Sequence, residues 1–361
     1  MQALLQAFAA AAKPEGPERI GMEYERFVLR ADGAPVPYSG PDGVEELLRD
    51  LQRRLGWDAL EEQGRLLGLQ AADGAGFSLE PGAQLEYASR PHASLRPLAQ
   101  ELAGIDALVA ARAAQRSQRL HAAGVHPSAT PQDLELIPKA RYAVLEPYLR
   151  RAGELGLWMM KCTCGVQFSL DYRAPEDAAR KLRVALRLAP VFLALSANSP
   201  RAGYRSFRGH IWSRTDPARC GIPQALTRAD STLADYLLWA QSVPRIFAEP
   251  LRHLSTLFPE SRLRPGRLEL RCFDSVPAPL ALGFAALVKG VFYDPAALSA
   301  AEALSAAWSY DQLLAAWHGA QRFGLDAPGL REQARALLDS ARLPPEERGF
   351  LAPVAERLAG A

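Results

Sequence analysis

Acidic and other polar residues alternate with apolar ones in several short segments of the chain, a spacing that places the polar side chains on one face of a β-strand. Glu23 and Glu25 alternate with apolar neighbours, and Gln84 and Glu86 repeat the spacing further along the chain. Glu269 continues the pattern in a third segment. If these segments are strands, each of them offers one apolar face and one carboxylate-bearing face.

Two carboxylates on one strand face need compensation. Glu23 and Glu25 would lie roughly 6.6 Å apart by strand rise, and their repulsion is about 2.5 kcal/mol at an effective dielectric constant of ~20. A solvated outer face of an antiparallel sheet is the alternative interpretation, but Glu is depleted in strands. Hard oxygen ligands without histidine or paired cysteine indicate magnesium or manganese rather than zinc.

Arginines lie in or beside the same segments. Arg141, Arg208 and Arg271 offer planar, permanently charged groups for carboxylates or phosphates, although a surface ion pair is the commoner fate of a single arginine. Gln167 alternates with apolar residues in a further predicted strand. Acidic metal ligands together with such arginines indicate phosphoryl chemistry on an anionic substrate.

Composition narrows the function classes. The 361 residues are 48% hydrophobic and carry a formal charge of +2 without a basic tail, which argues against nucleic acid as a main partner. No segment predicts a membrane span or a cleaved leader, so we expect a cytoplasmic protein. The P-loop, dinucleotide, G-x-S-x-G and H-E-x-x-H motifs are absent. The scattered cysteines predict reduced thiols: Cys162, Cys164, Cys220 and Cys272.

Periodicity predicts an α+β fold. Helical spacing covers residues 44–55, 95–121, 142–155, 175–196, 231–247 and 278–292, and strand spacing covers residues 20–30, 77–89, 165–172 and 267–273. Pro81-Gly82 predicts a hairpin turn. We expect a catalytic domain over residues 1–294 and a helical C-terminal extension over 295–361 that packs on it, together forming one structural unit.

The motifs resemble those of the plant-type glutamate-cysteine ligases, a family found in plants and bacteria. The similarity covers most of the chain between residues 20 and 294, and the motifs occur in family order. They are Ile20–Phe27, Ser78–Glu86, Arg141-Tyr142, Met159-Met160, Thr163-Cys164, Val166–Asp171, Ala197–Pro200, Arg208–Trp212 with Asp216, Arg219–Gly221 and Leu268–Arg271.

The resemblance implies a glutamine-synthetase-like fold, in which a curved antiparallel sheet with an acidic concave face is backed by helices and followed by a C-terminal helical segment. It also implies the site residues. The magnesium ligands would be Glu23, Glu25, Glu80, Glu86 and Glu269, with Gln167 nearby; Arg271 and Glu269 would be catalytic; and Arg141, Thr163, Arg208 and Trp212 would bind substrate.

The family reaction implies ATP, magnesium (or manganese), glutamate and cysteine as ligands, and γ-glutamylcysteine as the product. The glutamate γ-carboxylate would attack the γ-phosphate of ATP, and the amine of cysteine would displace phosphate from the resulting acyl phosphate. The sequence departs from the family pattern at Gly165, Cys220 and Cys272-Phe273, and these departures would change the shape of the acceptor pocket. A different amine acceptor, a guanidino phosphotransferase and a non-catalytic relative remain as alternatives.

Overall fold

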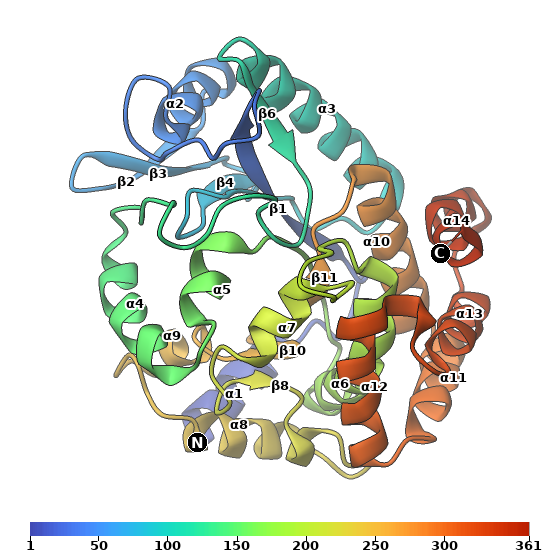
Figure 1. Ribbon diagram of the computed structural model, residues 1–361. Helices are drawn as coiled ribbons and strands as arrows, with labels where there is room; N and C mark the ends of the chain where they lie inside the picture. The colour runs from blue at the N-terminus through green and yellow to red at the C-terminus, as the bar shows by residue number, and fades with distance from the viewer. Residues whose placement is uncertain (361) are drawn as a thin grey trace.

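A large antiparallel sheet forms the centre of the computed structural model, which describes residues 1–360 (Figure 1). Its strands follow the order β10-β11-β7-β1-β5-β4-β3-β2, and β6 pairs with the far half of β1. The strands of this sheet are β1 (Ile20–Arg30), β2 (Asp58–Glu62), β3 (Arg65–Gln70), β4 (Gly76–Leu79), β5 (Leu85–Ala88), β6 (Gln118–His121), β7 (Gly165–Leu170), β10 (Ser261–Arg264) and β11 (Arg267–Asp274). The predicted α+β fold is confirmed.

Strand β1 organises the sheet because its length allows it to pair with three partners. Its first half pairs with β7 on one side and with β5 on the other, and its last four residues pair with β6. Met22 and Tyr24 alternate with Glu23 and Glu25 and are buried among apolar side chains. The alternation therefore sends the two carboxylates to the opposite face of the sheet.

Two hairpins complete the part of the sheet that carries the site. Strands β4 and β5 are joined by the predicted turn at Pro81-Gly82. Strands β10 and β11 are joined at Pro265-Gly266, where Gly266 adopts a φ of +84° that favours glycine. A small parallel pair, β8 (Cys220–Gly221) and β9 (Phe258–Pro259), lies beside this second hairpin.

Helices cover the apolar face of the sheet. Helix α6 is almost completely buried and contacts β10 and β11, and α10 contacts β1 and β7. Helix α3 packs beside α10 and against α2 and β6. The bounds of these helices are α2 (Val44–Leu55), α3 (Leu95–Ala114), α6 (Pro175–Ser196) and α10 (Ala278–Phe292).

The prediction of one helix over residues 95–121 is wrong at its end. Helix α3 stops at Ala114, a turn follows with Ser117 at a φ of +54°, and residues 118–121 form β6. Gln118 is buried there and donates to the carbonyl of Asp42 at 2.6 Å. Tertiary pairing with β1 overrides the local helical spacing.

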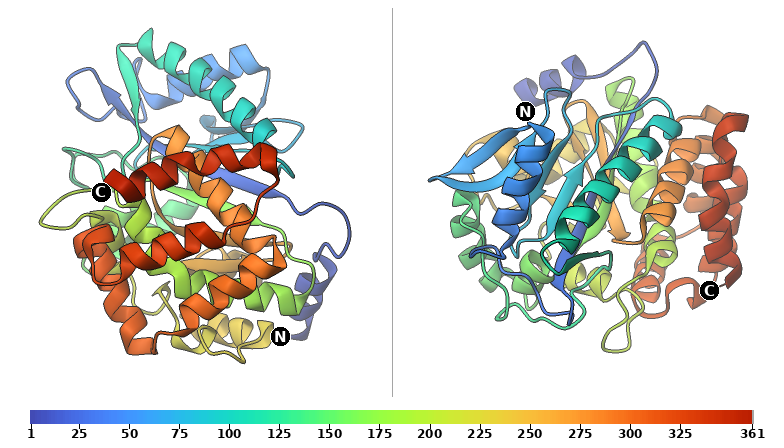
Figure 2. Two further views of the ribbon diagram at one scale, coloured as in Figure 1. Left: turned by 90° about the vertical axis from the view of Figure 1, so that its right-hand side faces the viewer. Right: turned by 90° about the horizontal axis from the view of Figure 1, so that it is seen from above.

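The remaining helices occupy the other side of the molecule and the C-terminal layer. Helices α4 and α5 lie near the β4–β5 hairpin, whereas α11 to α14 form an outer layer against α6 and α10 (Figure 2). Their bounds are α1 (Gln2–Ala10), α4 (Ala140–Ala152), α5 (Gly156–Cys162), α7 (Phe207–Ser213), α8 (Leu233–Ser242), α9 (Pro250–Leu254), α11 (Pro295–Ala306), α12 (Tyr310–Phe323), α13 (Leu330–Ser340) and α14 (Ala352–Gly360). The predicted domain division at residue 294 stays a prediction.

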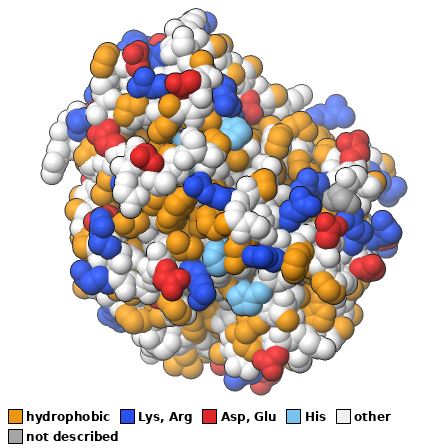
Figure 3. All heavy atoms as spheres, viewed as in Figure 1, with side chains coloured by type: hydrophobic (Ala, Val, Ile, Leu, Met, Phe, Trp, Pro, Cys, Tyr) orange, Lys and Arg blue, Asp and Glu red, His pale blue; other side chains and the backbone are white. Residues whose placement is uncertain are grey.

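The surface and the helices agree with the balanced composition. On the face shown in Figure 3, positive, negative and hydrophobic side chains are interspersed rather than gathered by sign. Within residues 1–360, no single helix is both long and apolar enough to cross a membrane. Helices α10 and α11 reach that length and composition only as a pair, which bends by 95° between them.

Candidate active site

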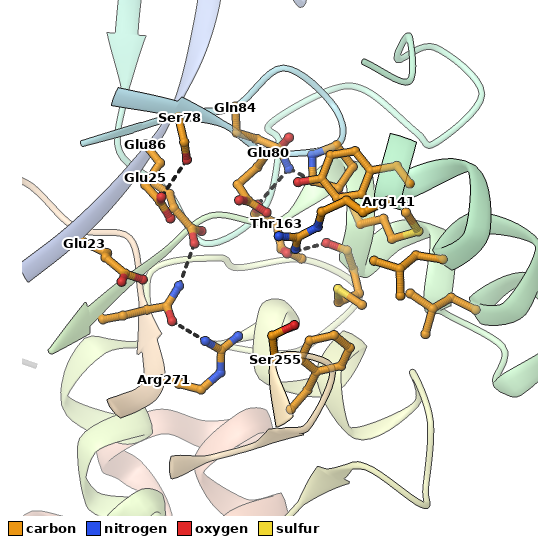
Figure 4. Close-up of a pocket in the computed structure, with 18 of the residues that line it drawn as sticks. Glu23, Glu25, Ser78, Glu80, Gln84, Glu86, Arg141, Thr163, Ser255 and Arg271 are labelled. Carbon is orange, nitrogen blue, oxygen red and sulfur yellow. Dashed lines mark hydrogen bonds between the residues drawn. The ribbon is translucent and has the colours of Figure 1, made fainter. Parts of the chain in front are cut away.

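A cavity of about 220 Å³ opens on the carboxylate-bearing side of the sheet (Figure 4). Its floor is formed by residues of β1, β4, β5, β7, β10 and β11, and its wall by residues of α4, α5, α7 and the segment before β9. Nine of the residues predicted for the site line this cavity: Glu23, Glu25, Glu80, Glu86, Arg141, Thr163, Gln167, Trp212 and Arg271.

Strand register brings the carboxylates together from distant parts of the sequence. Glu25 on β1 lies directly opposite Glu86 on β5, and Glu23 lies opposite Gln167 on β7. Glu86 in turn accepts a hydrogen bond of 2.7 Å from Ser78 on β4. Two neighbouring strands, β1 and β5, therefore present their acidic side chains to one space, flanked by polar side chains of β4 and β7.

Hydrogen bonds fix the centre of this floor. Glu25 accepts from the backbone N–H of Gly165 at 2.6 Å and from the side-chain amide of Gln167 at 2.9 Å. The amide oxygen of Gln167 accepts a hydrogen bond from Arg271. Figure 4 shows this chain from Glu25 to Arg271 crossing the floor of the cavity.

Glu80 reaches the cavity from the turn between β4 and β5. The turn packs tightly on α5, because a β-carbon at Gly82 would lie 2.4 Å from the carbonyl oxygen of Lys161. Gln84 ties the turn down by donating to the carbonyls of Met160 and Thr163 at 3.2 and 3.0 Å. Glycine and glutamine in this hairpin thus place Glu80 opposite the sheet carboxylates.

The helical wall adds cationic and apolar groups. Arg141 lines the cavity and makes no ion pair among residues 1–360, which leaves its guanidinium free for a ligand. The hydroxyl of Thr163 donates to the carbonyl of Met159 at 2.7 Å, so its hydrogen is already engaged. Tyr142 lies under Arg141, and its buried hydroxyl has no hydrogen-bond partner in the described chain.

Two predicted site residues lie behind the cavity rather than on its surface. Glu269 forms ion pairs with Arg262 and, at 2.9 Å, with Arg267. Arg208 is buried and donates to the carbonyl of Arg271 at 3.0 Å. The metal-binding role of Glu269 and the substrate-binding role of Arg208 stay predictions.

Electrostatics separate the carboxylates into two kinds. Burial, followed by repulsion from Glu80, raises the pKa of Glu25 to about 7. Burial also raises the pKa of Glu86 well above its usual value, and repulsion from Glu23 adds to the effect. For Glu269, burial alone would raise the pKa, but attraction to neighbouring arginines lowers it to about 2.

Magnesium fits the chemistry of the carboxylates whose pKa values are raised. Burial and repulsion from Glu269 raise the pKa of Glu23 as well, so the acidic floor lacks sufficient positive charge of its own. A bound divalent cation would relieve this repulsion. In the described residues, no three acidic, histidine or cysteine side chains are yet arranged around a common metal position, so binding would have to draw the carboxylates together.

Sequence reasoning gave no site role to several other cavity residues, among them Ser78, Ser255, Phe258 and Arg262. Arg262 carried a usable signal, because Pro265-Gly266 separates it from Glu269 in the manner of a hairpin. The register then places Arg262 directly opposite Glu269. Ser255 follows α9 and Phe258 begins the two-residue strand β9, and the positions of both depend on tertiary packing.

Comparison with known proteins identifies relatives that match most of the chain. A sequence model of glutamate-cysteine ligase family 2 (GCS2) matches residues 19–351. The chloroplastic glutamate–cysteine ligase B of Oryza sativa subsp. japonica is 28% identical over 390 residues, covering 96% of this chain and 78% of the rice protein. The chloroplastic glutamate–cysteine ligase of Arabidopsis thaliana is 30% identical over 345 residues, covering 85% of this chain and 65% of the relative.

Solved structures support the fold. A glutamate–cysteine ligase from Francisella tularensis, crystallised with AMP, superposes with a TM-score of 0.59 at 12% identity, covering 97% of this chain and 83% of that one. A bifunctional glutathione synthetase from Pasteurella multocida gives a TM-score of 0.57 at 14% identity, covering 95% of this chain and 48% of that one. This chain thus spans about half of the bifunctional protein. The match to the family model over most of the sequence shows that the chain belongs to glutamate-cysteine ligase family 2.

Proposed function

We propose that this chain catalyses the ATP-dependent ligation of the glutamate γ-carboxylate to the amine of cysteine, giving γ-glutamylcysteine, ADP and phosphate. The observation that carries the proposal is the convergence, in one cavity of a family member, of four glutamates with Arg141 and Arg271. Such a site can hold an anionic donor beside the triphosphate of ATP.

The arginines bring the two anionic reactants together. Arg141, which has no carboxylate partner in the described chain, is placed to bind a substrate carboxylate or phosphate. Arg271 is anchored by Gln167 and faces the acidic floor, where it would stabilise the charge of the transferring phosphoryl group. The hydrogen bond from Arg271 to Gln167 also links the guanidinium to Glu25, which accepts from the same side-chain amide.

Magnesium is the cation that we propose for the acidic floor, with Glu23, Glu25, Glu80 and Glu86 as its ligands. Glu269 would have to exchange an arginine contact for the ion to join this set. When bound, the ion would neutralise phosphate oxygens and so reduce the repulsion between donor and nucleotide. Gly165 and Gln167 keep Glu25 oriented toward that position.

The reaction then proceeds through an acyl phosphate. A γ-carboxylate oxygen of glutamate attacks the γ-phosphorus of ATP, and ADP leaves. The amine of the acceptor, after losing a proton, attacks the acyl carbon, and phosphate leaves with the former carboxylate oxygen. Holding these groups in line is the main task of a rigid site, which the sheet provides.

The apolar end of the cavity favours a small acceptor side chain. Leu145, Leu149, Met159 and Met160 line it beside Tyr142. Cysteine suits this environment because a thiol is weakly polar and packs well against methionine. A different amine is the second candidate acceptor, since Gly165 and Cys272-Phe273 depart from the family pattern close to Arg208 and Arg271.

A panel of amines tests this function. Purified protein is incubated with ATP, magnesium and glutamate, ADP release is measured for each amine, and the products are identified by mass. We expect cysteine to give the highest kcat/KM and a product with the mass of γ-glutamylcysteine. A phosphorylated guanidine, or an amide formed only with another amine, would contradict the proposal.

A further inference from the structure

A second, smaller cavity lies directly behind the active-site cavity and shares Trp212, Phe258 and Arg271 with it. Arg208 and Glu260 complete its polar lining. Its volume is about 10 Å³, which is room for roughly one water-sized group. The cavity therefore suits a single small polar group that projects from a ligand in the larger cavity.

Opposite charges face this space without pairing. Glu260 is only 7% exposed and forms no ion pair with Arg208 or Arg271. Within the described chain its carboxylate accepts one side-chain hydrogen bond, at 3.1 Å from the indole N–H of Trp317. A carboxylate can accept about four hydrogen bonds, so most of its capacity is unused.

Three buried donors nearby are also free. The Nε atoms of Arg208 and Arg271 and the indole Nε1 of Trp212 have no hydrogen-bond partner in residues 1–360. Buried polar groups are normally satisfied, and each exception needs an explanation. An ammonium group in the small cavity would pair with Glu260, and a carboxylate of the same ligand in the larger cavity would accept from Arg271 and Trp212, which line both. These two groups together form the headgroup of an α-amino acid.

The chain fixes Glu260 by its backbone and through α12. Its N–H donates to the carbonyl of Gly221, and its own carbonyl accepts from the N–H of Arg271, both at 3.0 Å. Trp317 on α12 packs over Gly221, where a β-carbon would lie 3.3 Å from the indole ring. Trp317, in the helical segment after residue 294, therefore contacts both Glu260 and Gly221, whose carbonyl accepts from Glu260.

We propose that Glu260 binds the ammonium group of an amino-acid substrate and that Trp317 is the positioning residue that holds Glu260 in place. The inference rests on the proposed function, and it gives the C-terminal helical segment a part in the active site. Burial raises the pKa of Glu260 to about 7, and a bound ammonium would stabilise the charged carboxylate.

The test measures KM values for glutamate, cysteine and ATP in the wild type and in Glu260→Gln. We expect the KM of one amino acid to rise at least tenfold while the KM of ATP changes less than twofold. Glutarate, which lacks the ammonium of glutamate, is compared as an inhibitor. If Glu260 binds glutamate, the Glu260→Gln variant should bind glutamate more weakly and glutarate as strongly as the wild type does. If Glu260 binds the acceptor, only the KM of cysteine should rise.

Trp317→Phe keeps an aromatic ring but loses the donor, and we expect the same KM to rise by a smaller factor. Trp308→Phe, in the same C-terminal segment, and Glu347→Gln, another buried glutamate that pairs with Lys289, are the matched controls and should leave every KM unchanged. The inference is overturned if Glu260→Gln and Trp317→Phe lower the melting temperature but change no amino-acid KM.

Failure of the proposed function would give a different result. If the wild type ligates no amine, the function is wrong, and calorimetric binding of glutamate and cysteine to wild type and Glu260→Gln still tests the inference. Weaker binding of one amino acid to the variant supports the role of Glu260. Equal binding to both proteins overturns it.

Discussion

The carboxylates of the acidic floor and the carboxylate of Glu269 lie on the same sheet and differ in their counter-charges. In the acidic floor, Glu25 and Glu86 lie opposite each other, and their pKa values are raised by burial and by other glutamates. Two strands away, Glu269 is as deeply buried but lies between Arg262 and Arg267, and its pKa is lowered to about 2.

The difference indicates that Glu269 stabilises the fold, whereas the carboxylates of the acidic floor are arranged to bind a ligand. Glu269 has its cations within the chain, so its ion pairs form when the protein folds. The floor carboxylates have too few cations, and their repulsion is a cost of folding that a bound cation would offset. Substitutions in the two groups should therefore have opposite consequences for activity and for stability.

The largest expected effect is on turnover. Glu23→Gln removes one charge from the acidic floor, and we expect kcat to fall by about 10²–10³ or more, as for the loss of other electrostatic groups in active sites. The free energy of unfolding should stay the same or increase, because a repulsion is removed. Steady-state kinetics and urea unfolding check both parts, and an equally active variant would remove the metal-site assignment.

Glu269→Gln should act mainly on stability. It leaves Arg262 and Arg267 without a counter-ion, and breaking a buried ion pair from one side typically costs about 3–5 kcal/mol. Urea unfolding measures the loss. If Glu269→Gln were as stable as the wild type while Glu23→Gln unfolded, the comparison between the two groups would be reversed.

Arg271→Lys tests the residue that joins the two groups. Lysine keeps the charge but loses the planar fork, so the hydrogen bond to Gln167 and any second contact to phosphate cannot both form. We expect kcat to fall by about 10²-fold, with a much smaller change in the KM of glutamate. A rise in that KM alone would make Arg271 a substrate binder.

Gly165→Ala probes the boundary between the floor and Arg208. A β-carbon at Gly165 would lie 2.6 Å from Nη2 of Arg208 and 2.9 Å from the carbonyl oxygen of Phe273, so the guanidinium must move. We expect the KM of an amino-acid substrate to rise about tenfold. Gly21→Ala on β1 is the control, because its β-carbon would meet Ser169 at an ordinary 3.7 Å. Equal KM values for the two variants would show that the position of the Arg208 guanidinium does not affect substrate binding.

A further expected effect is a pH dependence of stability in metal-free buffer. The pKa of Glu25 is raised from 4.5 to about 7, so the folded state retains a proton that the unfolded state loses in this window. The contribution of Glu25 to stability is therefore present below pH 4.5 and lost as the pH rises to about 7. Glu25→Gln should flatten this part of the profile, measured by urea unfolding; an unchanged profile would contradict the assignment.

Glu269 should give the opposite trend at lower pH. Its pKa is lowered from 4.5 to about 2, so its contribution to stability is complete above pH 4.5 and lost as the pH falls toward 2. The Glu269→Gln variant should lack this acid-induced loss. The two windows do not overlap, so one set of unfolding curves distinguishes the two groups.

The sequence predicted which side chains share a strand face better than it predicted which strands pair with each other. Alternation was sufficient to place Glu23 and Glu25 on one polar face, because the period of a strand is two residues. It could not predict that Glu25 lies opposite Glu86, since register depends on how distant segments pair. The family resemblance instead indicated that Glu25 and Glu86 belong to one site, and membership of that family is confirmed.

The missed contacts share one physical cause. The family resemblance implied Glu269 as a metal ligand, and that role stays a prediction. Its ion pair with Arg262 was missed because β10, the strand that carries Arg262, was not recognised. Trp317 and Glu260 are 57 positions apart in the chain, and the packing of α12 on α6, α7 and Gly221 brings them together. Such long-range contacts leave no local periodicity to detect.

Isotope transfer tests the proposed reaction most directly. Glutamate with oxygen-18 in its γ-carboxylate is incubated with the wild type, ATP, magnesium and cysteine, and the released phosphate is analysed by mass. Activation as an acyl phosphate predicts one oxygen-18 in the phosphate for each amide formed, because the bridging oxygen leaves with phosphorus. Unlabelled phosphate formed together with the amide would contradict an acyl-phosphate route and, with it, the role assigned to this site.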